Sequence, residues 1–112
     1  MASGRMRRVD EAVREVLSDA IASELKDPRI GFVTVTAVQT SPDLRHARVY
    51  VSVLGDEPTR AASLEGLASA HGVLQRRLAR ELRLKHTPAL SFHYDTSIDH
   101  GMRITELLDG DA

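Results

Sequence analysis

The pattern of hydrophobic and polar positions divides the chain into helices and strands in a definite order. Across residues 9–25, apolar side chains recur every three or four positions, which is the spacing of a helix with one buried face. These side chains belong to Val9, Ala12, Val13, Val16, Leu17, Ala20 and Ile21. The helix is expected to end before Pro28, because a proline ring pushes the preceding residue out of the helical region.

The segments 32–40 and 46–54 are rich in β-branched residues and are predicted to be strands. In the second segment the alternation is strict, with Ala47, Val49, Val51 and Val53 on one side and Arg48, Tyr50 and Ser52 on the other. In the first segment, Val33, Val35 and Ala37 are predicted to share one face, and Thr34 and Thr36 the other. The turn signal at residues 41–43 between the two segments predicts an antiparallel pair with one covered face.

Residues 64–85 are predicted to form two helical segments that meet at Gly72, because glycine inside a helix costs about 1 kcal/mol relative to alanine and favours a bend. At about 100° per residue, a set of leucines shares one face. They are Leu64, Leu67, Leu74, Leu78 and Leu82. Arg76, Arg80 and Arg83 lie roughly opposite, and Arg77 flanks them. The element therefore carries a core stripe and a basic stripe, although a solvated face without function produces the same pattern.

The remaining segments complete the order of elements. Residues 55–59 are a loop in which Thr59 is expected to cap the next helix, and Thr87-Pro88 ends the helical region. Residues 89–94 alternate between apolar and polar types and are predicted to be a strand. A last helical turn is expected over residues 102–108, and residues 1–6 and 109–112 are expected to be flexible.

The predicted order is helix, strand, strand, helix, helix, strand. Three strands do not form a stable sheet in isolation, so helices must cover one face. The fold class is therefore predicted to be α+β, with a three-stranded sheet in one layer and helices in the other. The length of 112 residues fits a single domain, residues 1–112.

Composition excludes several classes of protein. Hydrophobic residues make up 42% of the chain and charged residues 28%, which is ordinary for a globular protein. No apolar run approaches the roughly 20 residues of a membrane-spanning helix, and the basic N-terminus lacks the apolar core of a secretory signal. The absence of cysteine excludes disulfides and thiolate chemistry and fits a cytoplasmic protein.

Charge is unevenly distributed, although the net charge is only -1. One basic group follows Gly72 and consists of Arg76, Arg77, Arg80, Arg83 and Lys85; a second, near the N-terminus, consists of Arg5, Arg7 and Arg8. Acidic residues are concentrated towards the C-terminus. A local basic surface attracts phosphate within a Debye length of roughly 8–10 Å whatever the net charge. Nucleic acid is therefore the favoured class of ligand.

Several blocks of sequence resemble the ribosome-binding factor A family in one continuous order. They comprise residues 24–31, 33–36, 41–44, 47–55, 70–72, 82–84, 87–88, 92, 94–95, 97 and 101–104. The resemblance implies a type II KH-like fold, which has the predicted order of elements. Ordinary KH domains clamp the nucleic-acid backbone with a Gly-x-x-Gly loop. Here, as in the family, the equivalent join is an Ala-x-Gly kink at Ala70, His71 and Gly72.

The resemblance also implies a function. Members of the family are bacterial cytoplasmic factors that bind the free 30S subunit and its 16S ribosomal RNA. They assist late maturation and processing of the RNA 5′ end, and they support growth in the cold. By this resemblance the protein is expected to be a non-enzymatic monomer with no cofactor, no metal and no membrane partner. A ribosome-associated GTPase is expected to promote its release.

The predicted RNA contacts are basic side chains, because the planar fork of arginine matches phosphate oxygens. They are Arg76, Arg77, Arg80, Arg83, Lys85, Arg5, Arg7, Arg8, Arg45 and Arg48. Tyr50 can stack on a base, although cross-strand packing is the simpler interpretation. For His71, packing at the helix bend and contact with RNA both remain open.

Two alternatives belong to other functional classes. In the first, the protein is an adaptor whose sheet docks a ribosomal protein or a GTPase. In the second, it is a small hydrolase that uses His93 with Asp95 or Asp99, although solvated carboxylates at a strand end explain that cluster better. The histidines lack the spacing of metal ligands.

Overall fold

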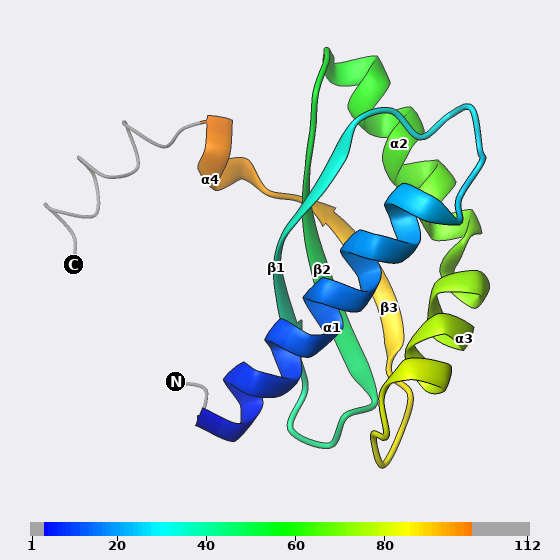
Figure 1. Ribbon diagram of the computed structural model, residues 1–112. Coiled ribbons are helices and arrows are strands. Elements are labelled where there is room, and N and C mark those ends of the chain that lie inside the picture. The colour runs from blue at the N-terminus through cyan, green and yellow to red at the C-terminus, as the bar shows by residue number, and fades with distance from the viewer. Residues whose placement is uncertain (1–3, 100–112) are drawn as a thin grey trace, which may run out of the picture.

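The computed structural model describes residues 4–99. Its elements are α1 (Gly4–Ser23), β1 (Val33–Thr40), β2 (His46–Val53), α2 (Glu57–Ser69), α3 (His71–Glu81), β3 (Ala89–Tyr94) and the short α4 (Thr96–Asp99). In the sheet, β2 is central, antiparallel to β1 and parallel to β3. Helices α1, α2 and α3 lie on one face of the sheet (Figure 1). The predicted fold class and element order are confirmed, and α4 is an addition to them.

The core lies between the sheet and the three helices. The apolar positions of β2, from Ala47 to Val53, are all buried, as their alternation predicts. From the central helices, Leu67, Leu74 and Leu78 are fully buried and are flanked by partly buried leucines. Full burial of one such side chain stabilises the fold by about 1.5–3 kcal/mol. The predicted leucine face is therefore confirmed, and it attaches α2 and α3 to the sheet.

The edge strand β1 departs from the prediction at its middle. Val35 and Ala37 pair with consecutive residues of β2, so Thr36 is an extra residue and forms a β-bulge. Beyond the bulge the alternation is reversed, and Val38 is buried while Ala37 is exposed. The prediction that Ala37 lies on the covered face is therefore wrong. Strict alternation assumes a regular strand, and a bulge shifts every later side chain to the other face.

Helix α1 begins at Gly4 rather than at the predicted Val9. The structure places the N-terminal arginines in its first turns, whereas the sequence predicts a flexible arm up to residue 6. The carboxylate of Asp10 accepts a hydrogen bond from the backbone N–H of Thr40 at 2.9 Å, which joins α1 to the end of β1. Residues 1–3, the predicted helical turn at 102–108 and residues 109–112 lie outside the described residues.

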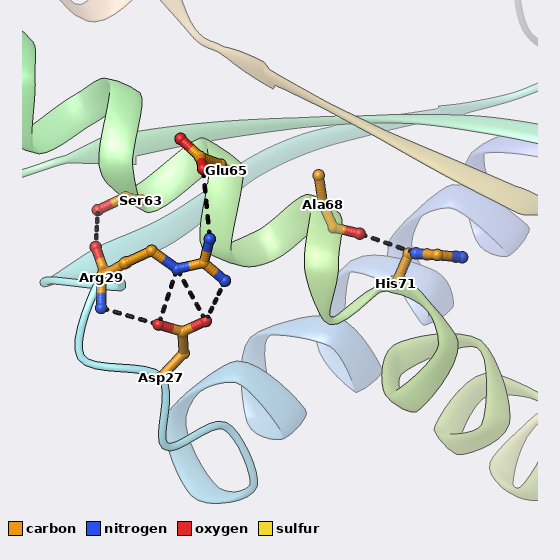
Figure 2. A network of polar contacts seen from close by, with 6 residues as sticks. All are labelled: Asp27, Arg29, Ser63, Glu65, Ala68 and His71. Atoms are coloured by element: carbon orange, nitrogen blue, oxygen red, sulfur yellow. Dashed lines mark hydrogen bonds and ion pairs between the residues drawn. The ribbon is translucent and has the colours of Figure 1, made fainter.

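The break between α2 and α3 falls at Ala70, whose φ is -90° and ψ 5°. Gly72 is the second residue of α3, so the predicted meeting point is wrong by two residues. A Cβ added at Gly72 would meet the Arg76 side chain at 3.6 Å, which is ordinary contact, so packing does not require glycine there. The Nδ1 atom of His71 lies 2.8 Å from the carbonyl oxygen of Ala68 (Figure 2). The ring therefore satisfies a terminal carbonyl of α2.

The loop between α1 and β1 is fixed onto α2. The buried Ser63 hydroxyl accepts a hydrogen bond from Gly31 N at 3.1 Å and donates one to the carbonyl of Arg29 at 3.3 Å. The guanidinium of Arg29 pairs with Asp27 at 2.6 Å and with Glu65 at 3.4 Å (Figure 2). The hydrogen bonds from Arg29 lower the pKa of Asp27. Arg29 is thus engaged within the protein.

Two further contacts define α2. The helix is capped by Asp56 rather than by Thr59 as predicted, because the Asp56 carboxylate accepts a hydrogen bond from the backbone N–H of Thr59 at 3.0 Å. At Gly66, an added Cβ would lie 2.6 Å from Cγ1 of Ile30, so glycine is required for the close approach of the loop.

Candidate nucleic-acid interface

The parallel pairing of β2 with β3 brings two basic segments together. Because the strands run in the same direction, their first residues lie at the same end of the sheet, with His46 opposite Ala89. A basic pair lies near the start of each strand: Arg45-His46 at the start of β2, and Lys85-His86 in the loop before β3. The first turn of α1 lies at the same end of the molecule (Figure 1). Three segments distant in sequence therefore converge there.

We call this surface the basic end and define it by Arg5, Arg45, Arg83, Lys85 and His86. Arg5, Arg83 and Lys85 line an open depression of about 440 Å³ together with apolar side chains such as Leu44. Arg5, Arg45, Lys85 and His86 line an adjoining depression of about 360 Å³. All of these basic side chains are exposed except His86, which is half-buried. The geometry presents several positive charges around two adjoining hollows.

The turn between β1 and β2 holds the backbone of Arg45 in place. The Asp43 carboxylate accepts hydrogen bonds from the Ser41 hydroxyl at 2.7 Å and from Arg45 N at 3.0 Å. Leu44 adopts a φ of 62°, a left-handed conformation that is uncommon for leucine. The carbonyl of Arg45 accepts a hydrogen bond from Ala89 N at 2.8 Å, which ties the turn to β3. The backbone is therefore fixed while the guanidinium remains exposed.

Asp43 is the acidic residue among those that line these two depressions. Its Oδ2 atom lies 3.9 Å from Nε of Arg45, and both side chains are well exposed. Such a pair contributes little to stability because water screens it. The hydrogen bond from the Ser41 hydroxyl is the largest cause of the lowered pKa of Asp43. One carboxylate among four cationic side chains leaves the basic end positive.

Arg77 is in the opposite situation. Its guanidinium donates to Glu24 at 2.8 Å and also pairs with Asp19 and Glu81. Only 16% of the side chain is exposed. The hydrogen bond to Glu24 is the largest cause of the raised pKa of Arg77. We call these four residues the Arg77 cluster; it joins α3 to α1 and leaves the guanidinium unavailable to a ligand.

The other predicted contacts are spread over several surfaces. Arg76 and Arg80 point outwards from α3, with Arg80 68% exposed and 3.9 Å from Glu24. Arg7 lies beside β1 in a hollow of mixed charge, and Arg8 is exposed on α1. Arg48 is exposed on the face of the sheet opposite the helices. The predicted basic stripe is thus divided, and only part of it joins the basic end.

Sequence reasoning missed His86 as a member of this surface. A signal was present, because Arg45-His46 and Lys85-His86 are similar pairs that each lie near the start of a strand. That signal becomes informative only when β2 and β3 are known to be parallel neighbours. The order of strands in the sheet was not predicted, so nothing in the sequence joined the two pairs.

The residues of the alternative hydrolase site have structural partners. Nε2 of His93 lies 2.9 Å from the hydroxyl of Ser91. Asp95 accepts hydrogen bonds from the hydroxyls of Ser97 and Thr36, at 2.6 and 2.7 Å, and these lower its pKa. The side chain of Asp99 lies outside the described residues.

Two further kinds of feature do not occur in the described part of the chain. Among residues 4–99, no group of three histidine or acidic side chains is placed to hold a metal ion. Within the same range, no helix has the length and apolar character needed to cross a membrane.

These observations define a class of protein. The order of elements, the sheet covered on one face and the helix break at Ala70 are those of a small KH-like domain, and the basic end suits a polyanion. The chain belongs to the ribosome-binding factor A family, whose model matches residues 5–108. The resemblance seen in the sequence is therefore confirmed.

Individual relatives agree with this assignment. The chain is 48% identical over 104 residues to ribosome-binding factor A of Halothermothrix orenii, covering 93% of this chain and 85% of the relative. It is 47% identical over 104 residues to the Geobacter sulfurreducens protein of the same name, covering 93% and 88%. The crystal structure of ribosome-binding factor A from Thermus thermophilus matches with a TM-score of 0.71 at 31% identity, covering 80% of this chain and 94% of that one.

A further match concerns a complex. A homology model of the Thermus thermophilus factor, fitted into a cryo-electron-microscopy map of a 30S complex, matches with a TM-score of 0.65 at 31% identity. The match covers 78% of this chain and 91% of that one.

Proposed function

We propose that this protein is a non-enzymatic assembly factor that binds the free 30S ribosomal subunit through its 16S ribosomal RNA. It assists late maturation and processing of the RNA 5′ end, and it supports growth in the cold. It acts in the cytoplasm as a monomer, without a cofactor, and a ribosome-associated GTPase promotes its release. Membership of the ribosome-binding factor A family supports this proposal, as does the Thermus thermophilus relative placed in a 30S complex.

The observation that carries the proposal is the convergence of Arg5, Arg45, Arg83 and Lys85 at one end of the fold. A cluster of cations around a hollow neutralises several phosphates at once and releases their counterions. These contacts position the protein on folded RNA without reading its sequence. Arg76, Arg80, Arg7 and Arg8 lie on other surfaces and add only long-range attraction for phosphate. Arg77 is left out because its guanidinium already has three carboxylate partners.

The direct test is sedimentation with purified ribosomal particles. The protein should co-sediment with free 30S subunits and not with complete ribosomes, and the amount bound should fall steeply as salt rises. Equal binding to both particles, or binding indifferent to salt, would contradict the proposal.

The adaptor alternative makes a different prediction. If a ribosomal protein were the contact, binding to 30S subunits would depend weakly on salt, and neutral variants of the basic end would bind normally. Naked 16S RNA would then compete poorly for the protein. Under our proposal, naked RNA competes, and its competition weakens in parallel with 30S binding as salt rises.

A further inference from the structure

The face of the sheet opposite the helices is uncovered in the part of the chain that the structure describes (Figure 1). Its side chains follow the register of the strands. One row across the sheet contains Gln39, Arg48 and Ser91, and the next contains Ala37, Tyr50 and His93. All of these residues are exposed except Tyr50, which is half-buried. We call this surface the open sheet face.

The second row contains a pair of rings. The ring centroids of Tyr50 and His93 are 5.6 Å apart, and their planes are inclined by 37°. His93 is steadied by Ser91, whose hydroxyl lies 2.9 Å from Nε2. Ala37, opposite Tyr50 in the register, is turned outwards by the β-bulge. The His93 ring is therefore held beside Tyr50, and the neighbouring side chain on β1 is only a methyl group.

The first row supplies charge. Arg48 lies between Gln39 and Ser91, both neutral, and no aspartate or glutamate occurs in β1, β2 or β3. Gln39, Arg48, Ser91 and His93 border an open depression of about 710 Å³ that continues to His46, next to Arg45 of the basic end. Asp10 also borders it, but one of its carboxylate oxygens is engaged by the backbone N–H of Thr40. The depression thus holds one cation, Arg48, and one carboxylate, Asp10, and it adjoins the basic end.

We propose that the open sheet face binds single-stranded RNA, with a base stacked on the Tyr50–His93 pair and a backbone phosphate held by Arg48. The proposal rests on the function proposed above and adds a second contact to it. An unpaired base is required because the bases of a duplex stack on one another, whereas single strands stack their bases on aromatic side chains. A protein partner fits less well, because the two rows lack the apolar core typical of a protein interface.

Tyrosine fluorescence tests the proposal at its own site. The chain has two tyrosines and no tryptophan, so a Tyr94→Phe background leaves Tyr50 as the fluorophore. An oligouridylate of about eight nucleotides, within the range of single-strand site sizes, should quench Tyr50 fluorescence. A blunt RNA duplex of the same length should not. Quenching by the duplex alone, or no quenching at saturating oligouridylate, would overturn the proposal.

Matched variants separate the contributions of the two rows. His93→Ala should weaken oligouridylate binding by about 5- to 20-fold, because one base loses its stacking partner. Arg48→Gln should reduce the salt slope of that binding by about 0.7, the value for one phosphate of a single strand. Thr34→Ala, on the same face but away from the rings, is the control and should bind normally.

Two results distinguish failure of this inference from failure of the proposed function. If basic-end variants lose 30S binding while His93→Ala and Arg48→Gln bind oligouridylate normally, the sheet proposal falls and the function stands. If the sheet variants weaken 30S binding but not oligouridylate binding, the face contacts protein and the proposal is again overturned. Parallel loss of oligouridylate and 30S binding in the sheet variants supports it.

Discussion

Arg77 and Arg83 belong to the same basic stretch of sequence, yet the fold gives them opposite surroundings. Arg77 is surrounded by Asp19, Glu24 and Glu81, and only 16% of its side chain is exposed. Arg83 is exposed at the rim of a hollow shared with Arg5 and Lys85. Arg77 lies in α3 beside the carboxylates of α1 and the following loop, whereas α3 ends at Glu81 and not at the predicted residue 85, so Arg83 lies beyond the helix. An arginine in a basic stripe is therefore available to a ligand only where no acidic residue already pairs with it.

Reversing the charge of the basic end is expected to have the largest effect. In Arg5→Glu/Arg83→Glu/Lys85→Glu, affinity for 30S subunits should fall on the order of 100-fold at moderate salt, because several phosphate contacts become repulsive. Stability should change by no more than about 0.5 kcal/mol per site, since the side chains are exposed. Filter binding and urea unfolding measure the two quantities. Normal affinity in a folded variant would remove the basic end from the account.

The converse change, Arg77→Gln, should affect folding and not binding. It removes the cation that pairs with all three carboxylates and leaves Arg80, 3.9 Å from Glu24, as a more distant counter-charge, so the urea midpoint should fall. The fall should be smaller than in Leu78→Ala, for which a loss of about 2–5 kcal/mol is expected from the cavity. The exposed Arg76→Gln serves as the matched control for loss of one positive charge. An unchanged midpoint in Arg77→Gln would show that the cluster has no structural role.

The pH dependence of stability tests Asp95, whose hydrogen-bond partners are neutral hydroxyls, in contrast to the ionic Arg77 cluster. The hydroxyls of Ser97 and Thr36 lower the pKa of Asp95, so the unfolded state binds its proton more tightly. Asp95 therefore stabilises the fold above its ordinary pKa of about 3.9, and this contribution is lost as pH falls through the lower folded value.

In Asp95→Asn, the deficit in urea midpoint relative to the unmodified protein should be constant from pH 7 to 5 and shrink below about pH 4. The deficit should persist in high salt, because its partners are neutral, whereas that of Arg77→Gln should diminish. A deficit for Asp95→Asn that grows towards low pH would have the wrong sign for this account.

The smallest expected effect comes from Asp43→Asn. Asparagine retains an oxygen that can accept the hydrogen bonds of the turn, but the basic end loses its negative charge. Affinity for 30S subunits should rise by about two- to threefold at low salt, and the gain should vanish at high salt. Ser41→Ala, which disturbs the turn without changing charge, is the control. A loss of affinity in Asp43→Asn would mean that the turn geometry matters more than its charge.

Features that depend on neighbours in the sequence were predicted correctly, whereas features that depend on neighbours in space were not. The alternation of β2 and the leucine face of α2 and α3 were predicted correctly, because burial of a regular element follows its own period. The outward turn of Ala37 was not, because a bulge is a property of pairing with β2. The end of the first helix was marked by Pro28, whereas its start had no comparable signal.

The candidate site was predicted less well for the same reason. Residue type made Arg5, Arg45, Arg83 and Lys85 candidates, but it did not show that they come together. Their convergence depends on β2 and β3 being parallel neighbours. The engagement of Arg77 depends on Asp19 and Glu24, which lie more than fifty residues earlier in the chain. Helix phase alone contains no information about such partners.

The most direct measurement of the central claim is the salt dependence of 30S binding in two neutralised variants. In Arg83→Gln/Lys85→Gln, the slope of log affinity against log salt should fall by about 1.4–1.8, or 0.7–0.9 for each phosphate that is no longer neutralised. In Arg77→Gln, measured where the variant is fully folded, the slope should equal that of the unmodified protein. Equal slopes in all three proteins, or a reduced slope confined to Arg77→Gln, would contradict the account.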